Sequence, residues 1–211
     1  MTAREIEAAA VASGLVPLPI SAGSLLANYL QLLLRWNARL NLTAVRDPEQ
    51  IVRRHLLESL QSAQALPPVA TLLDFGSGAG LPGIPIAIVR REIHITLGES
   101  QRKKAAFLRE AVRTLSLNAE VYDGRIENMP NHRLYEAITL RAVDKMAEAC
   151  LIATQRLVPG GWLVLFATAR TEQSLIATLP NISWKHRLPT VGLDDGLLFI
   201  GQKSDVSRGT I

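Results

Sequence analysis

The feature that most limits the fold of this chain is a change of pattern at Thr71. From there onward, short apolar runs alternate with helix-length amphipathic segments, which is typical of a parallel sheet with crossover helices. The apolar runs predict strands at Thr71–Phe75, Ile93–Gly98, Ala119–Tyr122, Tyr135–Leu140 and Trp162–Thr168. The segments between them predict helices near Pro82–Arg90, Arg102–Thr114, Asp144–Leu157 and Thr171–Leu179. We therefore expect an α/β protein.

Two further strands are predicted near the C-terminus. Ile182–Leu188 and Leu197–Gln202 are joined by the turn-rich segment Pro189–Gly196 and are expected to form an antiparallel hairpin at the sheet edge. The complete sheet is then mostly parallel and seven-stranded. We expect residues 69–203 to form the α/β domain and residues 204–211 to be a mobile tail.

Residues 1–68 carry helical periodicity and no alternating segments, which predicts an N-terminal helical extension with three helices. The first runs from about Thr2 to Ser13. We expect Ser21 to cap the second helix and Asp47 to cap the third, with Gln50 placed to close a capping box.

Composition excludes several classes of protein. With 211 residues, of which 48% are hydrophobic, the chain can bury one substantial core but not two ordinary catalytic domains. Cys150 is the only cysteine, which excludes an internal disulfide, a cysteine zinc cage and a two-cysteine mechanism, and we expect no metal site. Neither a secretory signal nor a membrane span is apparent, so we expect a cytoplasmic protein with no membrane partner.

Residues 72–83, LLDFGSGAGLPG, stand where the first strand of the sheet turns into its helix. Glycines at such a turn let the backbone bend tightly and approach a ligand, and we expect Gly76 and Gly78 to do so. The alternative is a tight loop with no ligand. Because open parallel sheets bind ligands outside the carboxyl ends of their strands, the position of the loop favours a binding site.

The glycine spacing Gly78-x-Gly80-x-x-Gly83 also satisfies the dinucleotide fingerprint, so it does not identify the ligand alone. Asp74 precedes the loop, where a carboxylate would oppose a pyrophosphate but suit a ligand that carries a sulfonium and an α-amino group. This charge favours S-adenosylmethionine as the cofactor. An NAD-dependent oxidoreductase remains the alternative.

Other candidate residues follow the next two strands of the predicted sheet. Glu99 ends the second strand, where a carboxylate can accept hydrogen bonds from ribose hydroxyls, although a dinucleotide site would want the same residue. Ile126 and Glu127 follow the third strand, where they can hold an adenine.

Several segments together resemble the small-subunit ribosomal RNA methyltransferase G family, also called glucose-inhibited division protein B. They are Trp36–Thr43 (WNARLNLT), Arg46-Asp47-Pro48, Arg54-His55 and the glycine loop running into Ile84-Pro85. Glu58-Ser59 stands where Asp-Ser is common in the family, and Leu140-Arg141-Ala142-Val143 where Ser-Arg-Ala-Phe is usual.

The resemblance implies a class I methyltransferase (Rossmann-like) fold and methylation of N7 on one guanine of 16S ribosomal RNA. Its substrate would be that RNA or the small-subunit ribosomal particle, with no obligate protein partner. By position, the family's cofactor contacts fall on Gly76, Leu81, Ile126, Glu127 and Arg141, with Glu99 at the ribose. A methyltransferase of the same fold that acts on a small molecule or a protein is the alternative.

Arg141 is the residue that we expect nearest to the transferred methyl group. N7 of guanine carries no proton, so its methylation needs no general base, and a guanidinium can hydrogen-bond guanine O6 or fix a phosphate. The alternative role of Arg141 is a salt bridge to a cofactor-loop carboxylate such as Glu127, and the two roles can coexist. The Asn/Asp-Pro-Pro-aromatic motif of amino-group methyltransferases does not follow the fourth strand, which agrees with N7 as the target.

Residues 90–113 hold seven basic side chains and three acidic ones. The excess of four positive charges equals the net charge of +4 of the whole chain. Such a cluster attracts polyanions, with a solvated helix face as the alternative. Trp36 offers either a stacking surface for an extruded base or a core contact, and the core contact is favoured. His55 is interpreted as a structural hydrogen-bonding residue.

Overall fold

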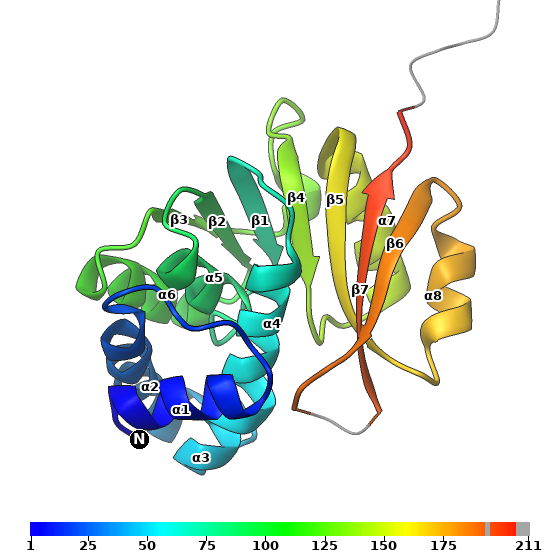
Figure 1. Ribbon diagram of the computed structural model, residues 1–211. Coiled ribbons are helices and arrows are strands. Elements are labelled where there is room, and N and C mark those ends of the chain that lie inside the picture. Colours follow the sequence, from blue (N-terminus) through cyan, green and yellow to red (C-terminus); the bar gives the residue numbers. More distant parts are fainter. Residues whose placement is uncertain (193–194, 206–211) are drawn as a thin grey trace, which may run out of the picture.

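In this computed structural model, residues 1–192 and 195–205 are described, and they form a seven-stranded sheet between two layers of helices (Figure 1). The sheet has the order β3-β2-β1-β4-β5-β7-β6. β1 to β5 are parallel, and β7 lies antiparallel between β5 and β6. The bounds are β1 Thr71–Phe75, β2 His94–Glu99, β3 Ala119–Asp123, β4 Tyr135–Leu140, β5 Leu157–Thr168, β6 Ile182–Pro189 and β7 Gly196–Lys203. The predicted mostly parallel sheet with its C-terminal antiparallel hairpin is confirmed.

The strand order reverses at β1, which pairs with β2 on one side and with β4 on the other. At such a switch point, the loops after neighbouring strands run to opposite faces of the sheet and leave a crevice at the carboxyl edge. Because the first five strands are parallel, the loops that follow all of them meet at this edge. The glycine loop after β1 lies at its centre.

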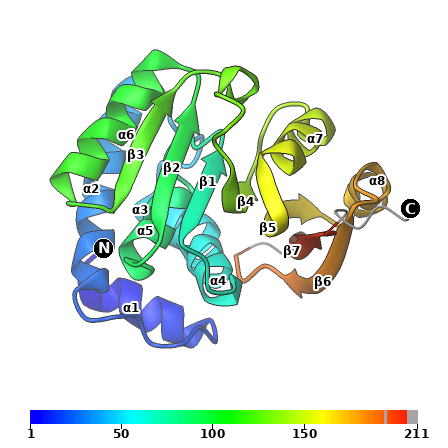
Figure 2. The same ribbon diagram turned by 90° about the horizontal axis from the view of Figure 1, so that it is seen from above.

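Helices cover both faces of the sheet, as a buried parallel sheet requires (Figure 2). One face carries α1 Ala3–Ala12, α2 Ala22–Leu40, α4 Leu57–Ala65, α5 Gly83–Val89 and α6 Arg102–Thr114, and the other carries α7 Met146–Arg156 and α8 Glu172–Thr178. No helix in the described part of the chain is long and apolar enough to cross a membrane. A single buried cluster joins Ile6 and Leu33 of the N-terminal helices to Val164 of the sheet.

The helix starts agree only partly with the sequence-based expectations. Thr2 caps α1 in a capping box with Glu5, and the Asp47 side chain accepts the Gln50 backbone N–H at 2.8 Å. Ser21 precedes α2 with a φ of 68°, and its side chain makes no capping bond. The prediction that Ser21 caps the helix with its side chain is therefore wrong.

The third helix of the extension is interrupted by a π turn. It consists of α3 Pro48–Ile51, the π turn η1 Val52–Leu56 and then α4. Hydrophobic periodicity predicted one regular helix here, because an extra residue in a single turn leaves no mark in the apolar pattern. π turns occur often at functional sites.

β5 begins at Leu157, whereas the sequence predicted a helix as far as that residue and a strand only from Trp162. Leu157 pairs with Tyr135, and the register then shifts before Ala137 pairs with Trp162. Residues 159–161, Pro-Gly-Gly, therefore lie inside β5, between the two paired parts of the strand. Of the expected tail, residues 206–211 lie outside the described residues.

Candidate active site

The glycine loop between β1 and α5 depends on backbone conformations that glycine adopts most readily. Gly76, Gly78 and Gly80 have φ angles of 72°, 56° and 85°. A Cβ atom at Gly80 would collide with the Ile84 side chain, whereas at Gly78 its nearest neighbour would be the Gly76 carbonyl oxygen at 3.7 Å. Gly80 therefore shapes the loop, and Gly78 leaves space for a ligand.

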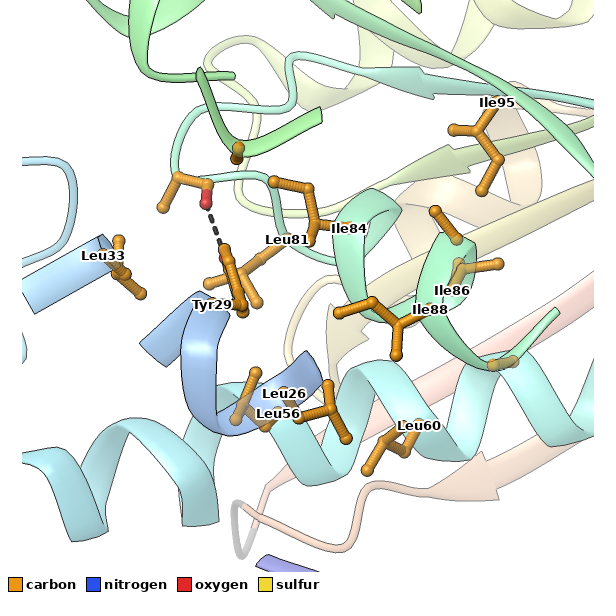
Figure 3. Packing of buried hydrophobic residues seen from close by; sticks show 14 of the residues in the cluster. Leu26, Tyr29, Leu33, Leu56, Leu60, Leu81, Ile84, Ile86, Ile88 and Ile95 are labelled. Carbon is orange, nitrogen blue, oxygen red and sulfur yellow. Dashed lines mark hydrogen bonds between the residues drawn. The ribbon is translucent and has the colours of Figure 1, made fainter. Parts of the chain in front are cut away.

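A tyrosine of the N-terminal extension supports the loop from behind. Figure 3 shows Tyr29 of α2 pointing at the loop, where its hydroxyl donates to the Ala79 carbonyl oxygen at 2.6 Å. Tyr29 is fully buried, and this burial raises the pKa of its hydroxyl, which stays protonated and remains a donor. The sequence analysis missed this contact because it joins segments 50 residues apart.

The carboxylate of Asp74 lies beneath the loop. Its Oδ1 accepts from the Thr139 hydroxyl at 2.7 Å, and its Oδ2 accepts from the Gly83 N–H, at the start of α5, at 3.1 Å. Burial raises the pKa of Asp74, and these hydrogen bonds oppose that shift. Asp74 is not among the described residues that line the cavity. It stabilises the loop, and direct contact with a ligand would require rearrangement.

Glu99 ends β2 at the cavity wall. Its Oε2 accepts from the Gly78 N–H at 2.9 Å, and its Oε1 accepts from the Gln101 N–H at 2.7 Å. Each carboxylate oxygen can accept a second hydrogen bond. Glu99 therefore connects β2 to the glycine loop and keeps acceptor capacity for hydroxyl groups in the cavity.

The loop after β3 supplies Ile126 and Glu127. Ile126 is buried, and a Cβ atom on Gly98 would lie 2.5 Å from its Cδ1 atom, so the small residue in β2 allows its close packing. Glu127 is exposed at the cavity. The buried Arg156 of α7 donates to the carbonyl oxygens of Ile126, Glu127 and Pro130 at 3.0–3.4 Å. The sequence analysis missed these hydrogen bonds, because the sequence of a helix does not reveal which distant loop one of its arginines contacts.

Arg141 follows β4 and reaches the π turn of the extension. Its Nη2 atom lies 2.7 Å from Glu58 Oε2, 2.8 Å from His55 Nδ1 and 3.1 Å from the Arg54 carbonyl oxygen. The guanidinium carbon also lies 5.7 Å from the ring centre of Phe166 in β5. Arg141 is therefore paired with Glu58, and the alternative prediction of a salt bridge to Glu127 is wrong.

The groups around Arg141 have shifted proton affinities. Burial, together with the Arg141 charge, lowers the pKa of His55 to about 4, so its ring is neutral at pH 7 and Nδ1 can accept from Arg141. The Thr43 hydroxyl contacts the other ring nitrogen at 3.2 Å. Burial raises the pKa of Glu58, and the Arg141 charge opposes this rise. His55 thus has the structural hydrogen-bonding role that the sequence indicated.

A cavity of about 970 Å³ opens along the carboxyl edge of the sheet. On the β1–β3 side, its wall includes the predicted residues Gly76, Gly78, Leu81, Glu99, Ile126 and Glu127. On the β4–β5 side, its wall includes Leu42, Thr43, His55, Glu58, Arg141 and Phe166. One cavity thus joins the predicted cofactor residues to Arg141.

The basic run of residues 90–113 is divided between structural and exposed positions. Arg90 donates to the carbonyl oxygens of Ala63 and Leu66 at the end of α4, and Arg109 pairs with Asp123. Lys103 is exposed on α6, and Lys104 lines the cavity. The run is therefore only partly available to a polyanion.

Trp36 packs against the hydrophobic cluster, with its ring centre 5.8 Å from that of Phe107 in α6. This contact agrees with the favoured interpretation of Trp36 as a core residue. The exposed Arg35 and Arg39 lie on the same helix, which packs against α6.

The strand order, the glycine loop at the switch point and the acidic residue ending β2 define a class I methyltransferase fold. Solved structures share it: the O-methyltransferase from Bacillus cereus, in complex with SAH, is 20% identical with a TM-score of 0.59 over 83% of this chain and 91% of that one. The N-methyltransferase NodS from Bradyrhizobium japonicum, in complex with S-adenosylhomocysteine, is 18% identical and has a TM-score of 0.57. The match covers 83% of this chain and 98% of NodS.

The chain belongs to the rRNA small subunit methyltransferase G family, whose model matches residues 23–185. A curated relative of that name from Xanthomonas campestris pv. campestris (strain 8004) is 44% identical over 193 residues, which is 88% of this chain and 90% of the relative. Another, from Stenotrophomonas maltophilia (strain K279a), is 44% identical over 163 residues, which is 77% of this chain and 76% of the relative.

Proposed function

We propose that this protein transfers a methyl group from S-adenosylmethionine to N7 of a guanine in 16S ribosomal RNA. The observation that carries the proposal is the single cavity in which the glycine loop and Glu99 face the same space as Arg141. Family membership supports ribosomal RNA as the substrate. The RNA can be naked or part of the small-subunit particle, and the compartment is the bacterial cytoplasm.

The geometry around α5 favours S-adenosylmethionine over a dinucleotide. A pyrophosphate binds at the N–H groups of a helix N-terminus, but here the Gly83 N–H already donates to the Asp74 carboxylate. A second anion at that position would be repelled. Glu99 retains acceptor capacity for ribose hydroxyls, and the exposed Glu127 can attract a ligand's positive charge. When bound, the cofactor supplies an electrophilic methyl group.

The β4–β5 side of the cavity suits an acceptor atom that carries no proton. His55 and Glu58 both engage Arg141, so neither is held ready as a general base. Of the five N–H donors of Arg141, those on Nε and Nη1 bond to none of the described residues, whereas Nη2 is engaged. These donors can bind O6 of a guanine and leave N7 to react, with its alignment to the methyl group carrying the rate.

Chemical mapping of N7-methylguanine in 16S RNA tests the proposal directly. Small-subunit particles and naked 16S RNA from cells lacking the gene are incubated with the protein and S-adenosylmethionine, reduced with borohydride, and cleaved with aniline. We expect one new cleavage site, which depends on both protein and cofactor. Methylation of another atom would contradict the N7 assignment. Binding of NAD rather than S-adenosylmethionine in calorimetry would contradict the cofactor.

Two lysines near the start of α6, the exposed Lys103 and the partly buried Lys104 at the cavity wall, are expected to contribute to RNA affinity. Replacing Lys103 and Lys104 by alanine should weaken binding and reduce the slope of log affinity against log salt by about 0.7 to 0.9 for each lost phosphate contact. Replacing Arg113, exposed at the far end of the helix, tests whether the footprint extends along α6.

A matched control for this measurement removes Arg4 and Lys185, two exposed charges outside both the cavity wall and the basic run of residues 90–113. The same loss of charge should leave the slope nearly unchanged. Equal slopes for both double variants would mean that α6 presents only a solvated face.

A further inference from the structure

The contacts of Arg141 come from one short stretch of the N-terminal extension. Glu58, His55 and the Arg54 carbonyl oxygen all lie within 3.1 Å of the same Nη2 atom. This nitrogen has two hydrogens, so the three acceptors share them and fill its bonding capacity. We propose that Glu58 and His55 are positioning residues for methyl transfer, which hold the Arg141 guanidinium by Nη2 and leave Nε and Nη1 for the target base.

Glu58 provides the fixed charge of this arrangement. Its side chain is 2% exposed and that of Arg141 is 14% exposed, so their 2.7 Å contact is shielded from water. An ion pair in such surroundings is stronger than on a surface, and loss of one partner leaves a buried charge without compensation. Glu58 therefore resists any rotation that would withdraw Nη2 from the π turn.

The π turn brings the acceptors together. Within Val52–Leu56 the regular i→i−4 hydrogen bonds of the helix are interrupted, and the Leu57 N–H bonds to the Val52 carbonyl oxygen. In this turn the Arg54 carbonyl oxygen accepts from the side chain of Arg141, which follows β4. One interrupted turn thus presents a carbonyl oxygen and an imidazole toward the same guanidinium.

The C-terminal hairpin holds the π turn and α4 from the other side. Gln61 of α4 donates to the Pro189 carbonyl oxygen at 2.8 Å and accepts from the Val191 N–H at 3.1 Å. Gly192 lies so close to the π turn that a Cβ atom there would collide with the Arg53 carbonyl oxygen. The positioning residues are therefore fixed between the hairpin and the cavity.

One oxygen of Glu58 remains without a hydrogen bond. Glu58 Oε1 is buried and unpartnered among the described residues, as is the hydroxyl of Thr190. The hydroxyl lies near enough to lower the pKa of Glu58, although it does not reach hydrogen-bonding geometry. The groups facing Glu58 are thus Arg141, the charge of Arg54 and the Thr190 hydroxyl.

The charge states required by the proposal follow from these surroundings. Arg141 is held best when Glu58 is ionised and His55 is neutral, because a protonated imidazole would repel the guanidinium. Acid protonates both groups, so that Glu58 loses its negative charge and His55 gains a positive one. Burial raises the pKa of Glu58 above its usual value and lowers that of His55 to about 4. Activity should accordingly hold near neutral pH and fall first as Glu58 becomes protonated.

The test of this inference rests on the proposed function and uses Glu58→Gln in the full chain. We expect kcat on small-subunit particles to fall by about 10-fold to 10²-fold, the scale of a misplaced catalytic group. Cofactor affinity, measured separately by calorimetry, should stay unchanged. The acid limb of the kcat profile should move to lower pH, because the raised carboxyl pKa is gone. Glu58→Asp, which keeps the charge on a shorter stem, should recover part of the loss.

Glu120→Gln is the matched control, because it removes a carboxylate from an ion pair with Arg133 outside the cavity wall. It should leave kcat and its pH profile unchanged. If Glu58→Gln folds poorly, His55 provides the second comparison. His55→Asn, whose amide oxygen can replace Nδ1, should retain more activity than His55→Phe.

A double-mutant cycle distinguishes positioning from a general structural role. If Glu58 acts through Arg141, adding Glu58→Gln to Arg141→Ala should lower kcat no further. Additive losses in kcat, or a wild-type kcat in Glu58→Gln, would overturn the inference. Failure of the wild-type protein to methylate any 16S RNA would instead overturn the proposed function.

Discussion

Replacing Arg141 by alanine is expected to lower turnover by about 10² or more, the effect of losing one preorganised electrostatic contact. The same change leaves Glu58 buried without its partner, which should destabilise the fold by about 3–5 kcal/mol unless the carboxyl takes up a proton. Arg141→Lys should rescue little, because an ammonium cannot bind the π turn and a base edge at the same time.

Single-turnover methylation with saturating cofactor measures the first effect, and denaturant unfolding measures the second. Arg141→Ala combined with Glu58→Gln is the informative control, because it removes the uncompensated charge. This double variant should recover stability without recovering turnover. Near-normal turnover in Arg141→Ala, or recovery of both properties together, would contradict a role for Arg141 in methyl transfer.

Gly76→Val is expected to reduce cofactor affinity by about 10² or more. At its φ of 72°, a β-branched side chain is strained, and its Cβ atom would also lie 3.2 Å from a methyl carbon of Val143. The new side chain therefore displaces the loop or the residues that follow β4, and either movement disturbs the cavity. Isothermal titration with S-adenosylmethionine measures the loss.

Gly160→Val separates backbone strain from loss of the site. Gly160 has the same φ of 72°, but it lies in β5 outside the cavity wall, and its Cβ atom would meet nothing closer than a Gln202 side-chain nitrogen at 3.9 Å. Both variants should unfold at lower temperature, whereas only Gly76→Val should lose the cofactor. Equal affinities in the two variants would remove Gly76 from the binding site.

Sequence reasoning succeeded where the relevant signal is local. Strand ends follow from short apolar runs, and the parallel connections then bring Gly76, Glu99 and Ile126 to one edge of the sheet. These residues could be gathered without coordinates because every parallel strand ends at the same side.

Partners distant in the sequence could not be predicted in this way. Arg141 meets Glu58 across 83 residues, and Tyr29 meets Ala79 across 50. The sequence suggested a cofactor-loop carboxylate such as Glu127 for Arg141, but the loop of Glu127 follows β3, which β2 and β1 separate from β4. Whether Arg141 meets Glu58 or Glu127 depends on how the helical extension packs on the sheet. The π turn sets which residues of the extension face Arg141, and it leaves no mark in the hydrophobic periodicity.

Asp74 shows that a charge argument from the sequence does not give the position of the carboxylate. We expected its charge to face the ligand, but the carboxylate lies below the loop and accepts the Gly83 N–H. Arg90 was likewise counted in a basic surface, although it bonds the last carbonyl groups of α4. Hydrogen-bond partners, which composition does not reveal, decide both cases.

The two hydrogen bonds between Gln61 and the hairpin join residues 128 and 130 positions apart in the sequence. This separation has a consequence for synthesis of the chain. A nascent polypeptide that has emerged only as far as β4 already contains its glycine loop and its π turn, but the strands that anchor the turn have yet to be translated. Contacts of such high sequence separation form late in folding. Activity toward ribosomal RNA would therefore begin only after β6 and β7 have been synthesised and have paired.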